Sequence, residues 1–414
     1  MQVNFKELYK QGADGEKLRY KRLTEGFAGE FGDAEGLEFF SAPGRTEIGG
    51  NHTDHNHGHV LAAAVDLDIA AAARKTEGNR VRVKSLEYPK IDVIDLGDLE
   101  MKEQEQGKSL AVIKGICARC RELGYKVGGF DAYTITKVLK GSGLSSSAAF
   151  EILIVTIISN LYNDGGIDPV TAAIIAQYSE NVYFGKPSGL MDQMASSVGS
   201  VISIDFKDPS KPVIKAIDFD LEKYKHALCV VDTGGNHADL TNDYAAIPYE
   251  MKEAAAFFGK EVLRDVDPEE FYKKIPELRE KVGDRAILRA LHFFDDDRIA
   301  WEEAAALEKG DFDAFLALIN KSGISSETRL QNVFAAVNPR EQGPSLSLEI
   351  SRRLLNGRGA CRVHGGGFAG TIQAFVPVDM LGEYKESIEA VFGKGTCYVL
   401  QFRGHGGVKV TGVN

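Results

Sequence analysis

The sequence predicts an α+β fold of two domains. Its first half places several strands in succession without crossover helices, which argues against a parallel sheet of βαβ units. Its second half shows mainly helical periodicity of apolar residues. A looser zone over residues 207–223 separates the halves. We therefore predict an N-terminal domain over residues 1–206 and a C-terminal domain over residues 207–414.

The elements follow from the spacing of apolar residues and from turn residues at their ends. The segment 5–31 predicts two polar amphipathic helices. Further helices are expected over residues 110–123, 148–162, 170–184, 249–258, 284–309, 312–321, 345–355 and 380–392. Strands are expected over residues 37–42, 60–74, 79–85, 91–96, 130–139, 201–206, 226–232, 360–364, 371–376 and 396–402.

Composition narrows the class of protein. The apolar share of 43% and the charged share of 26% are typical of a globular protein, and a formal charge of −11 argues against a nucleic-acid partner. The first residues lack the apolar core of a signal peptide, and the longest aliphatic run, 152–158, is too short to span a bilayer. Five scattered cysteines suit a reducing cytoplasm, where we expect the protein to act without a membrane or an obligate protein partner.

Cys117 and Cys120 form a C-x-x-C pair, a spacing also found in zinc and redox sites. No second pair of this kind occurs in the sequence. Both cysteines lie on one face of the predicted helix 110–123, so we expect them to be buried small hydrophobic residues.

A glycine-serine turn between a predicted strand and a predicted helix is a candidate anion site. Glycines let the backbone approach a ligand, and the first N–H groups of a helix lack internal partners and lie at the positive end of its dipole. The serines can cap the helix or reach a phosphate-bound metal. An ordinary capped helix is the alternative, and this is not a Walker A loop. The turn consists of Gly141, Ser142, Gly143, Leu144, Ser145, Ser146 and Ser147.

Three further segments carry polar or glycine-rich turns. Residues 44–58 are expected to form a loop whose histidines lack the spacing of a tetrahedral zinc site, so hydrogen bonding to a substrate by Arg45 and Asp54 is favoured. Residues 185–193 present Asp192 at the start of a helix, where an ordinary first-turn acid is the alternative. Residues 365–370 form a glycine-rich turn between two strands.

In this order, the segments resemble the galactokinases of the GHMP small-molecule kinase family. The resemblance covers roughly residues 38–410, and it implies an N-terminal module like ribosomal S5 domain 2, a ferredoxin-like C-terminal module, and an active site in the cleft between them. It rests on Gly44-Arg45 with His52-Thr53-Asp54, on Gly143-Leu144-Ser145-Ser146-Ser147-Ala148, on Gly189-Leu190-Met191-Asp192-Gln193, and on Arg362 with Gly365-Gly366-Gly367-Phe368.

The resemblance implies transfer of the γ-phosphate of ATP to the C1 hydroxyl of galactose or a close relative. Asp192 would take the proton of that hydroxyl, and Arg45 would stabilise the transferring phosphoryl group. Ser146 and Glu180 match magnesium ligands, and residues 141–147 match the loop that cradles the ATP phosphates. The residues matched to the sugar end are Asn51, His52, Asp54 and Tyr244.

The chain departs from the family at the sugar end. The usual signature Asn-Leu-Ile-Gly-Glu-His-Thr-Asp-Tyr is here Glu47-Ile48-Gly49-Gly50-Asn51-His52-Thr53-Asp54-His55. Asn51 thus replaces a glutamate expected near C6 of the sugar, and loss of that acid would favour a carboxylate there. Galacturonate and N-acetylgalactosamine are therefore alternatives to galactose. A sugar sensor without turnover is a further alternative, against which the intact Asp192 and Arg45 argue.

Overall fold

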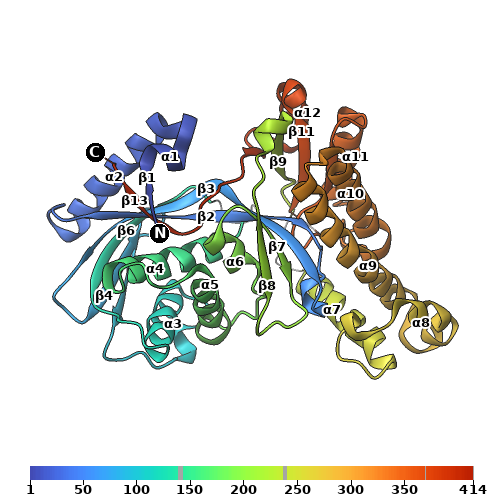
Figure 1. Ribbon diagram of the computed structural model, residues 1–414, viewed down its shortest axis with the longest axis horizontal. Coiled ribbons are helices and arrows are strands. Elements are labelled where there is room, and N and C mark those ends of the chain that lie inside the picture. Colours follow the sequence, from blue (N-terminus) through green and yellow to red (C-terminus); the bar gives the residue numbers. More distant parts are fainter. Residues whose placement is uncertain (139–142, 236–239, 369, 414) are drawn as a thin grey trace.

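Two β-sheets organise the chain in the computed structural model, which describes residues 1–138, 143–235, 240–368 and 370–413 (Figure 1). The strands are β1 Gln2–Asn4, β2 Glu38–Gly49, β3 His59–Lys75, β4 Arg80–Ser85, β5 Ile91–Asp95, β6 Phe130–Thr136, β7 Val201–Asp205, β8 Val213–Ile217, β9 His226–Asp232, β10 Ala360–Val363, β11 Thr371–Pro377, β12 Cys397–Leu400 and β13 Val408–Thr411. Nine of them form a mixed sheet in the order β1-β13-β2-β3-β6-β4-β5, to which β7 and β8 attach through β3. The other four form an antiparallel sheet in the order β10-β11-β9-β12.

Helices cover both faces of the large sheet, with α1 and α2 on one side and α3 to α6 on the other (Figure 1). Within the described residues, α7 to α11 lie beyond β9 in the chain and α12 follows β11. The helices are α1 Phe5–Tyr9, α2 Ala13–Phe31, α3 Ser109–Glu122, α4 Ser146–Tyr162, α5 Pro169–Tyr178, α6 Met191–Val198, α7 Thr241–Phe257, α8 Pro268–Lys273, α9 Ile275–Lys309, α10 Phe312–Ser325, α11 Gly343–Leu355 and α12 Leu381–Phe392.

Strand β3 is apolar on both faces because both are covered. Ala71 and Ala73 belong to the main core with residues of α3 and α4. Ala70 and Ala72, which alternate with them, pack in a second cluster with Leu23 of α2. A strand buried on both sides is expected to be a nearly continuous apolar run, which explains why the long stretch was predictable from its composition.

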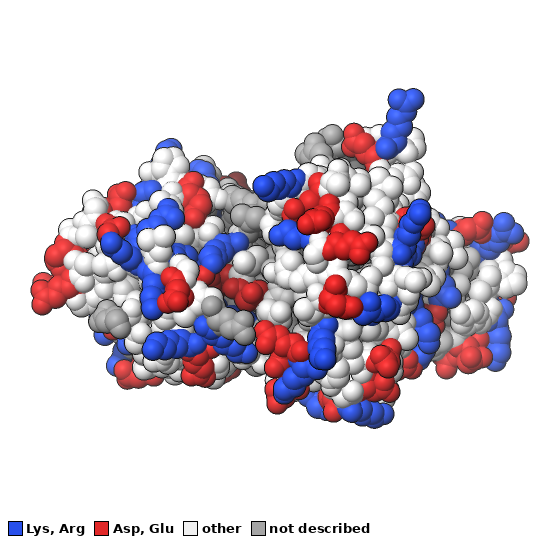
Figure 2. Space-filling model, turned by 90° about the horizontal axis from the view of Figure 1, so that it is seen from above, with Lys and Arg blue, Asp and Glu red and all other residues white. Residues whose placement is uncertain are grey.

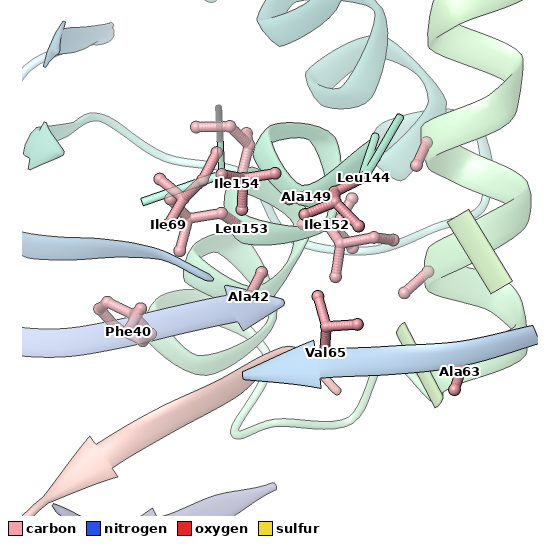
Figure 3. Close-up of a cluster of buried hydrophobic side chains, with 14 of the residues drawn as sticks. Phe40, Ala42, Ala63, Val65, Ile69, Leu144, Ala149, Ile152, Leu153 and Ile154 are labelled. Atoms are coloured by element: carbon pink, nitrogen blue, oxygen red, sulfur yellow. The ribbon is translucent and has the colours of Figure 1, made fainter. Parts of the chain in front are cut away.

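The main core anchors the helix that follows the predicted phosphate loop (Figure 3). Phe40 and Val65 of the sheet share this cluster with Leu144 of the loop and with Ile152 and Leu153 of α4, and all five are buried. Burying a side chain of this size stabilises the fold by about 1.5–3 kcal/mol. The start of α4 is therefore held against β2 by several such contacts.

Strand β2 extends further than predicted. The sequence predicted a strand over 37–42 and a loop from Gly44, whereas β2 continues through Pro43 to Gly49. The pairing with β3 shifts register between Pro43 and Arg45, and such a bulge accommodates a proline that cannot complete the ladder. As a consequence, Arg45 projects from a strand and not from a loop.

Three short strands, β1, β8 and β13, were missed, and β1 pairs with β13 at one edge of the large sheet. Strand β8 lies inside the predicted looser zone 207–223 and pairs with β7, while β13 pairs with β2 after the predicted last strand 396–402. All three are short and include polar residues, so their sequences alone are weak strand signals and their formation depends on the strands that they join. The division of the chain at residue 206 stays a prediction, and the pairings of β8 with β7 and of β13 with β2 show that segments beyond it contribute to the large sheet.

The prediction for the C-x-x-C pair is confirmed. Cys117 and Cys120 are free, buried residues of α3. Burial raises the pKa of the Cys120 thiol to about 12 and shifts that of Cys117 in the same direction. Both side chains are thus neutral hydrophobic groups of the core.

Candidate active site

Segments far apart in the sequence meet at a cavity of about 310 Å³. Its wall draws on β2, the start of α4, the start of α6 and the turn between β10 and β11. The lining residues are Arg45, Gly143, Ser145, Ser146, Ser147, Lys186, Asp192, Tyr244, His364, Gly365, Gly366, Gly367 and Thr371. A larger groove of about 1240 Å³ borders β9 and α10 and contains none of the predicted site residues. The chemistry of the predicted segments therefore points to the smaller cavity.

Arg45 and Asp192 form a bidentate ion pair in the wall of this cavity. Arg45 Nε lies 2.6 Å from Asp192 Oδ1, and Arg45 Nη2 lies 2.7 Å from Asp192 Oδ2. Arg45 Nη1 donates a third hydrogen bond to the carbonyl oxygen of Gly143. The planar guanidinium matches the carboxylate edge to edge, so both groups are held in one orientation.

The close approach of the phosphate loop to β2 depends on Gly44. The Arg45 backbone N–H donates to the Leu144 carbonyl oxygen at 3.0 Å. A Cβ atom at Gly44 would lie only 2.8 Å from that same oxygen. A side chain at position 44 would therefore push the loop away from Arg45 and open the contact.

Ser145 aligns Asp192 from the other side. Its hydroxyl donates to Asp192 Oδ2 at 2.7 Å, while its backbone adopts a left-handed conformation with φ of 53°. The prediction that the serines of this turn cap the helix was wrong for Ser145, which precedes α4 and makes no side-chain cap. The left-handed backbone costs about 1–3 kcal/mol and turns the hydroxyl toward the carboxylate.

Asp192 is ionised at neutral pH. Burial would raise the pKa of this carboxyl, but the charge of Arg45 and the hydrogen bonds from Arg45 and Ser145 outweigh burial and hold the pKa below its usual range. Burial lowers the pKa of the Arg45 guanidinium, but the charge and the hydrogen bonds of Asp192 outweigh burial, so the pKa of Arg45 is raised above its usual value. The cavity wall thus carries a fixed carboxylate and a fixed guanidinium in contact.

Glu180 lies beside this pair at the centre of a second network. Its Oε1 is 3.0 Å from Lys186 Nζ, and its Oε2 accepts from Ser188 Oγ at 2.6 Å and from Gln193 Nε2 at 2.8 Å. Glu180 lies in a π-helical turn, Ser179–Phe184. The backbone N–H of Lys186 donates to the Glu180 carbonyl oxygen at 3.1 Å, which keeps Lys186 close to the Glu180 side chain. Glu180 is therefore buried but held on polar partners.

Glu151 is a residue of this network that the sequence reasoning missed. Gln193 Nε2 donates to Glu151 Oε2 at 3.0 Å as well as to Glu180. Burial and the nearby Glu180 raise the pKa of Glu151 well above its usual value. The available signal was a single acid in the otherwise apolar stretch 148–158, since a charged residue on the buried side of a helix needs a partner.

The residues matched to the sugar end adjoin the glycine turn after β10 and the loop before α6. His52 Nε2 is 3.1 Å from the Gly366 carbonyl oxygen, and burial followed by the neighbouring His55 lowers the pKa of His52 to about 4. The Tyr244 hydroxyl donates to the Gly367 carbonyl at 2.8 Å. Asp54 lies close to the loop before Asp192, because a Cβ atom at Gly189 would be 2.6 Å from Asp54 Oδ2. Tyr244 lines the cavity itself.

Asn51 is not among the residues that line the cavity. Its side chain is buried and donates to Glu47 Oε1 at 2.9 Å and to the Gly365 carbonyl at 2.7 Å, while its Oδ1 accepts from Asn332 Nδ2 at 2.8 Å. Glu47 in turn pairs with the buried Arg362, whose Nη2 lies 3.0 Å from Oε1. A sugar contact by Asn51 stays a prediction. The contacts of its amide give it a structural role, because they join β2 to the glycine turn that begins at Gly365.

The histidine-rich segment does not assemble a metal site in the part of the chain that is described. Within those residues, no three His, Cys, Asp or Glu side chains converge as metal ligands. His59 instead lies 3.0 Å from Asp297 and 3.2 Å from Asp205. On the face shown in Figure 2, basic and acidic side chains are interspersed. None of the described helices combines the length and apolar character needed to cross a membrane.

Two family models match this chain. One is described as the galactokinase galactose-binding signature and matches residues 25–75, and the other as the GHMP kinases N terminal domain and matches residues 111–200. The galactokinase of Streptomyces coelicolor is 30% identical over 382 residues, which span 89% of this chain and 94% of that protein. The galactokinase of Glaesserella parasuis is 28% identical over 381 residues, or 89% and 93% of the two chains.

Solved structures give the same direction. A galactokinase of Lactococcus lactis in complex with galactose superposes with a TM-score of 0.80 at 25% identity, covering 94% of this chain and 100% of that one. A mevalonate kinase superposes with a TM-score of 0.62 at 15% identity, covering 89% and 99%, a likeness that concerns the fold alone.

Proposed function

Because the chain belongs to the galactokinases of the GHMP kinase family, we propose that it transfers the γ-phosphoryl group of ATP to the C1 hydroxyl of galactose or a close relative. The predicted two-domain GHMP kinase fold is confirmed by the likeness to the solved galactokinase. The observation that carries the proposal is the Arg45–Asp192 pair in one cavity with the first residues of α4. A fixed carboxylate beside an anion-binding helix start suits the activation of a hydroxyl next to a phosphate chain.

We propose that Asp192 accepts the proton of the attacking hydroxyl. The C1 oxygen forms a bond to the γ-phosphorus while the bond between that phosphorus and the β,γ-bridging oxygen breaks, and ADP leaves. The proton of the hydroxyl passes to an Asp192 oxygen. A carboxylate of lowered pKa is a weak base, but positioning and charge outweigh basicity in phosphoryl transfer. Arg45 orients Asp192 and offsets the negative charge that gathers at the transferred group.

We assign the magnesium ion of the ATP complex to Ser146 and Glu180. A hydroxyl and a carboxylate, completed by phosphate oxygens and water, are the hard oxygen ligands that this ion prefers. The fit is supported by Lys186, whose ammonium lies 3.0 Å from Glu180 Oε1 and so marks a position where a cation is stable. When bound, magnesium would offset charge on the phosphates. The backbone of residues 143–147 and the N-terminus of α4 would bind the remaining phosphate oxygens.

This metal assignment predicts a change in magnesium requirement. Ser146→Ala and Glu180→Gln should each raise the magnesium concentration that gives half-maximal activity several-fold, since each removes one oxygen ligand. The measurement is initial rate against free magnesium at saturating ATP and sugar. Glu151→Gln is the matched control, because Glu151 shares Gln193 with Glu180 but is no proposed ligand. An unchanged requirement in both test variants would contradict the assignment.

The substrate is tested by a panel of sugars. We expect ADP formation to depend on added sugar and to be fastest with galactose, with galacturonate and N-acetylgalactosamine as the alternatives to compare. The product should have lost its reducing end, because the phosphate occupies C1. A product that still reduces an oxidant would place the phosphate on another hydroxyl, and sugar-independent ADP formation would contradict the kinase proposal. A neutral His52 and the carboxylate Asp54 are the proposed partners of the ring hydroxyls.

We further propose that the protein acts in the cytoplasm. Its five cysteines are all free and buried, as expected in a reducing compartment. The partners that we propose are two small molecules, ATP and the sugar.

A further inference from the structure

Two cationic side chains, Arg45 and Lys186, line the described part of the cavity. Arg45 is held in place, because its guanidinium donates hydrogen bonds to both oxygens of Asp192 and to the carbonyl oxygen of Gly143. A third basic residue in the wall, His364, is uncharged, since burial and the charge of Arg45 lower its pKa to about 3. Lys186 is therefore the cation in this wall that is most free to change its partner.

The contact of Lys186 is of a kind that a ligand can replace. Its side chain is 58% exposed, whereas that of Glu180 is 4% exposed. The Glu180 carboxylate keeps two other donors, Ser188 and Gln193, on its second oxygen if Lys186 leaves. An ion pair with one exposed partner contributes little to stability, so moving the lysine costs the fold little.

The charges of the site show what could draw Lys186 away. Asp192 pairs with Arg45 and Glu180 pairs with Lys186, so the charges of these four side chains balance. Glu180 would hold the divalent cation of a bound nucleotide, and its carboxylate would then no longer need the ammonium of Lys186 as its partner. The ammonium of Lys186, on its flexible side chain, would then be free to turn toward the negative oxygens of the phosphates.

We propose that Lys186 is a phosphate-binding residue of this kinase, which pairs with Glu180 in the absence of nucleotide and turns to the β- or γ-phosphate when a divalent cation binds Glu180. This inference rests on the proposed function, because it assumes that ATP binds in this cavity. It adds a residue that moves between two partners, in contrast to Arg45, which stays on Asp192. It also links the affinity for nucleotide to the presence of the metal.

The test compares nucleotide binding by the wild type and Lys186→Met, which keeps the length of the side chain and removes the charge. Calorimetry with a non-hydrolysable ATP analogue, ADP and AMP should be run both with magnesium and with EDTA. With magnesium, Lys186→Met should bind the ATP analogue about 10- to 100-fold more weakly than the wild type and should bind AMP equally well. Lys186→Arg, which keeps the charge, should restore the affinity for the ATP analogue. In EDTA the ratio between variant and wild type should fall toward one.

The matched control is Lys215→Met, because Lys215 also pairs with a glutamate, Glu308, at 2.6 Å and is 64% exposed. This control should leave all affinities unchanged. Equal binding of the ATP analogue by wild type and Lys186→Met would overturn the inference, as would an equal loss for AMP or the same ratio with and without magnesium. A wild type that binds no ATP analogue at all would instead overturn the proposed function.

Discussion

Replacing Asp192 with asparagine should lower kcat for sugar phosphorylation by several orders of magnitude and leave the fold and ATP binding in place. The amide has the size of the carboxylate but accepts no proton from the sugar hydroxyl. It also presents an N–H₂ group in place of one carboxylate oxygen. That group accepts no hydrogen bond from Arg45, so at least one hydrogen bond is lost and the alignment of the side chain changes. Loss of a unit that both positions and deprotonates the nucleophile has effects of this size.

The expected affinity for ATP distinguishes a chemical role from a structural one. Asp192→Asn removes a negative charge from a cavity that binds phosphates, so the Kd for an ATP analogue should stay the same or fall. The measurements are kcat by a coupled ADP assay and Kd by calorimetry, with unfolding followed by circular dichroism. Ser145→Ala is the matched control, because it removes one hydrogen bond to Asp192 and keeps the carboxylate, and its loss in kcat should be far smaller. Near-wild-type turnover by Asp192→Asn contradicts the assignment.

The sequence predicted best those elements whose residues decide their own environment. Helices α3 and α4 and strand β3 are long and bury most of their residues, and each was predicted to within a few residues. The site segments were found because glycines and an acid occur in a family order. Gly141 and Ser142 of the predicted phosphate loop lie outside the described residues.

The features that the sequence could not predict depend on distant partners. Serine is a common helix-capping residue, but the hydroxyl of Ser145 donates to a carboxylate 47 residues away. Asn51 occupies a position matched to a sugar contact, yet its amide bonds to groups 281 and 314 residues away. Short strands such as β13 depend in the same way on the strand that they join. Local propensity carries none of this information.

Asn51 and Glu47 exchange the acid and the amide of the usual signature. At the first position of the signature the family has Asn and this chain has Glu47. At the fifth position the family has Glu and this chain has Asn51. The two side chains are joined by a hydrogen bond of 2.9 Å. An acid is therefore still present, at position 47 and not at position 51. The absence of an acid at position 51 is then no reason to expect a sugar that carries a carboxylate at C6. We expect no preference for galacturonate over galactose.

Asn51→Glu alone should destabilise the fold by about 2–4 kcal/mol, because it places a second carboxylate against Glu47 and the Gly365 carbonyl in a fully buried site. Glu47→Asn should also destabilise, since it leaves the buried Arg362 without its carboxylate. The double variant restores the family arrangement and should be less destabilised than the sum of the single variants by about 0.5–3 kcal/mol. Urea unfolding at pH 8.5 measures this, because burial raises the pKa of Glu47 to about 7 despite Arg362, and the group is ionised there. Glu47→Asn combined with Lys215→Met, which shares no partner with it, should be additive. Additivity in the Glu47–Asn51 pair as well would show that the exchange is not a coupled one.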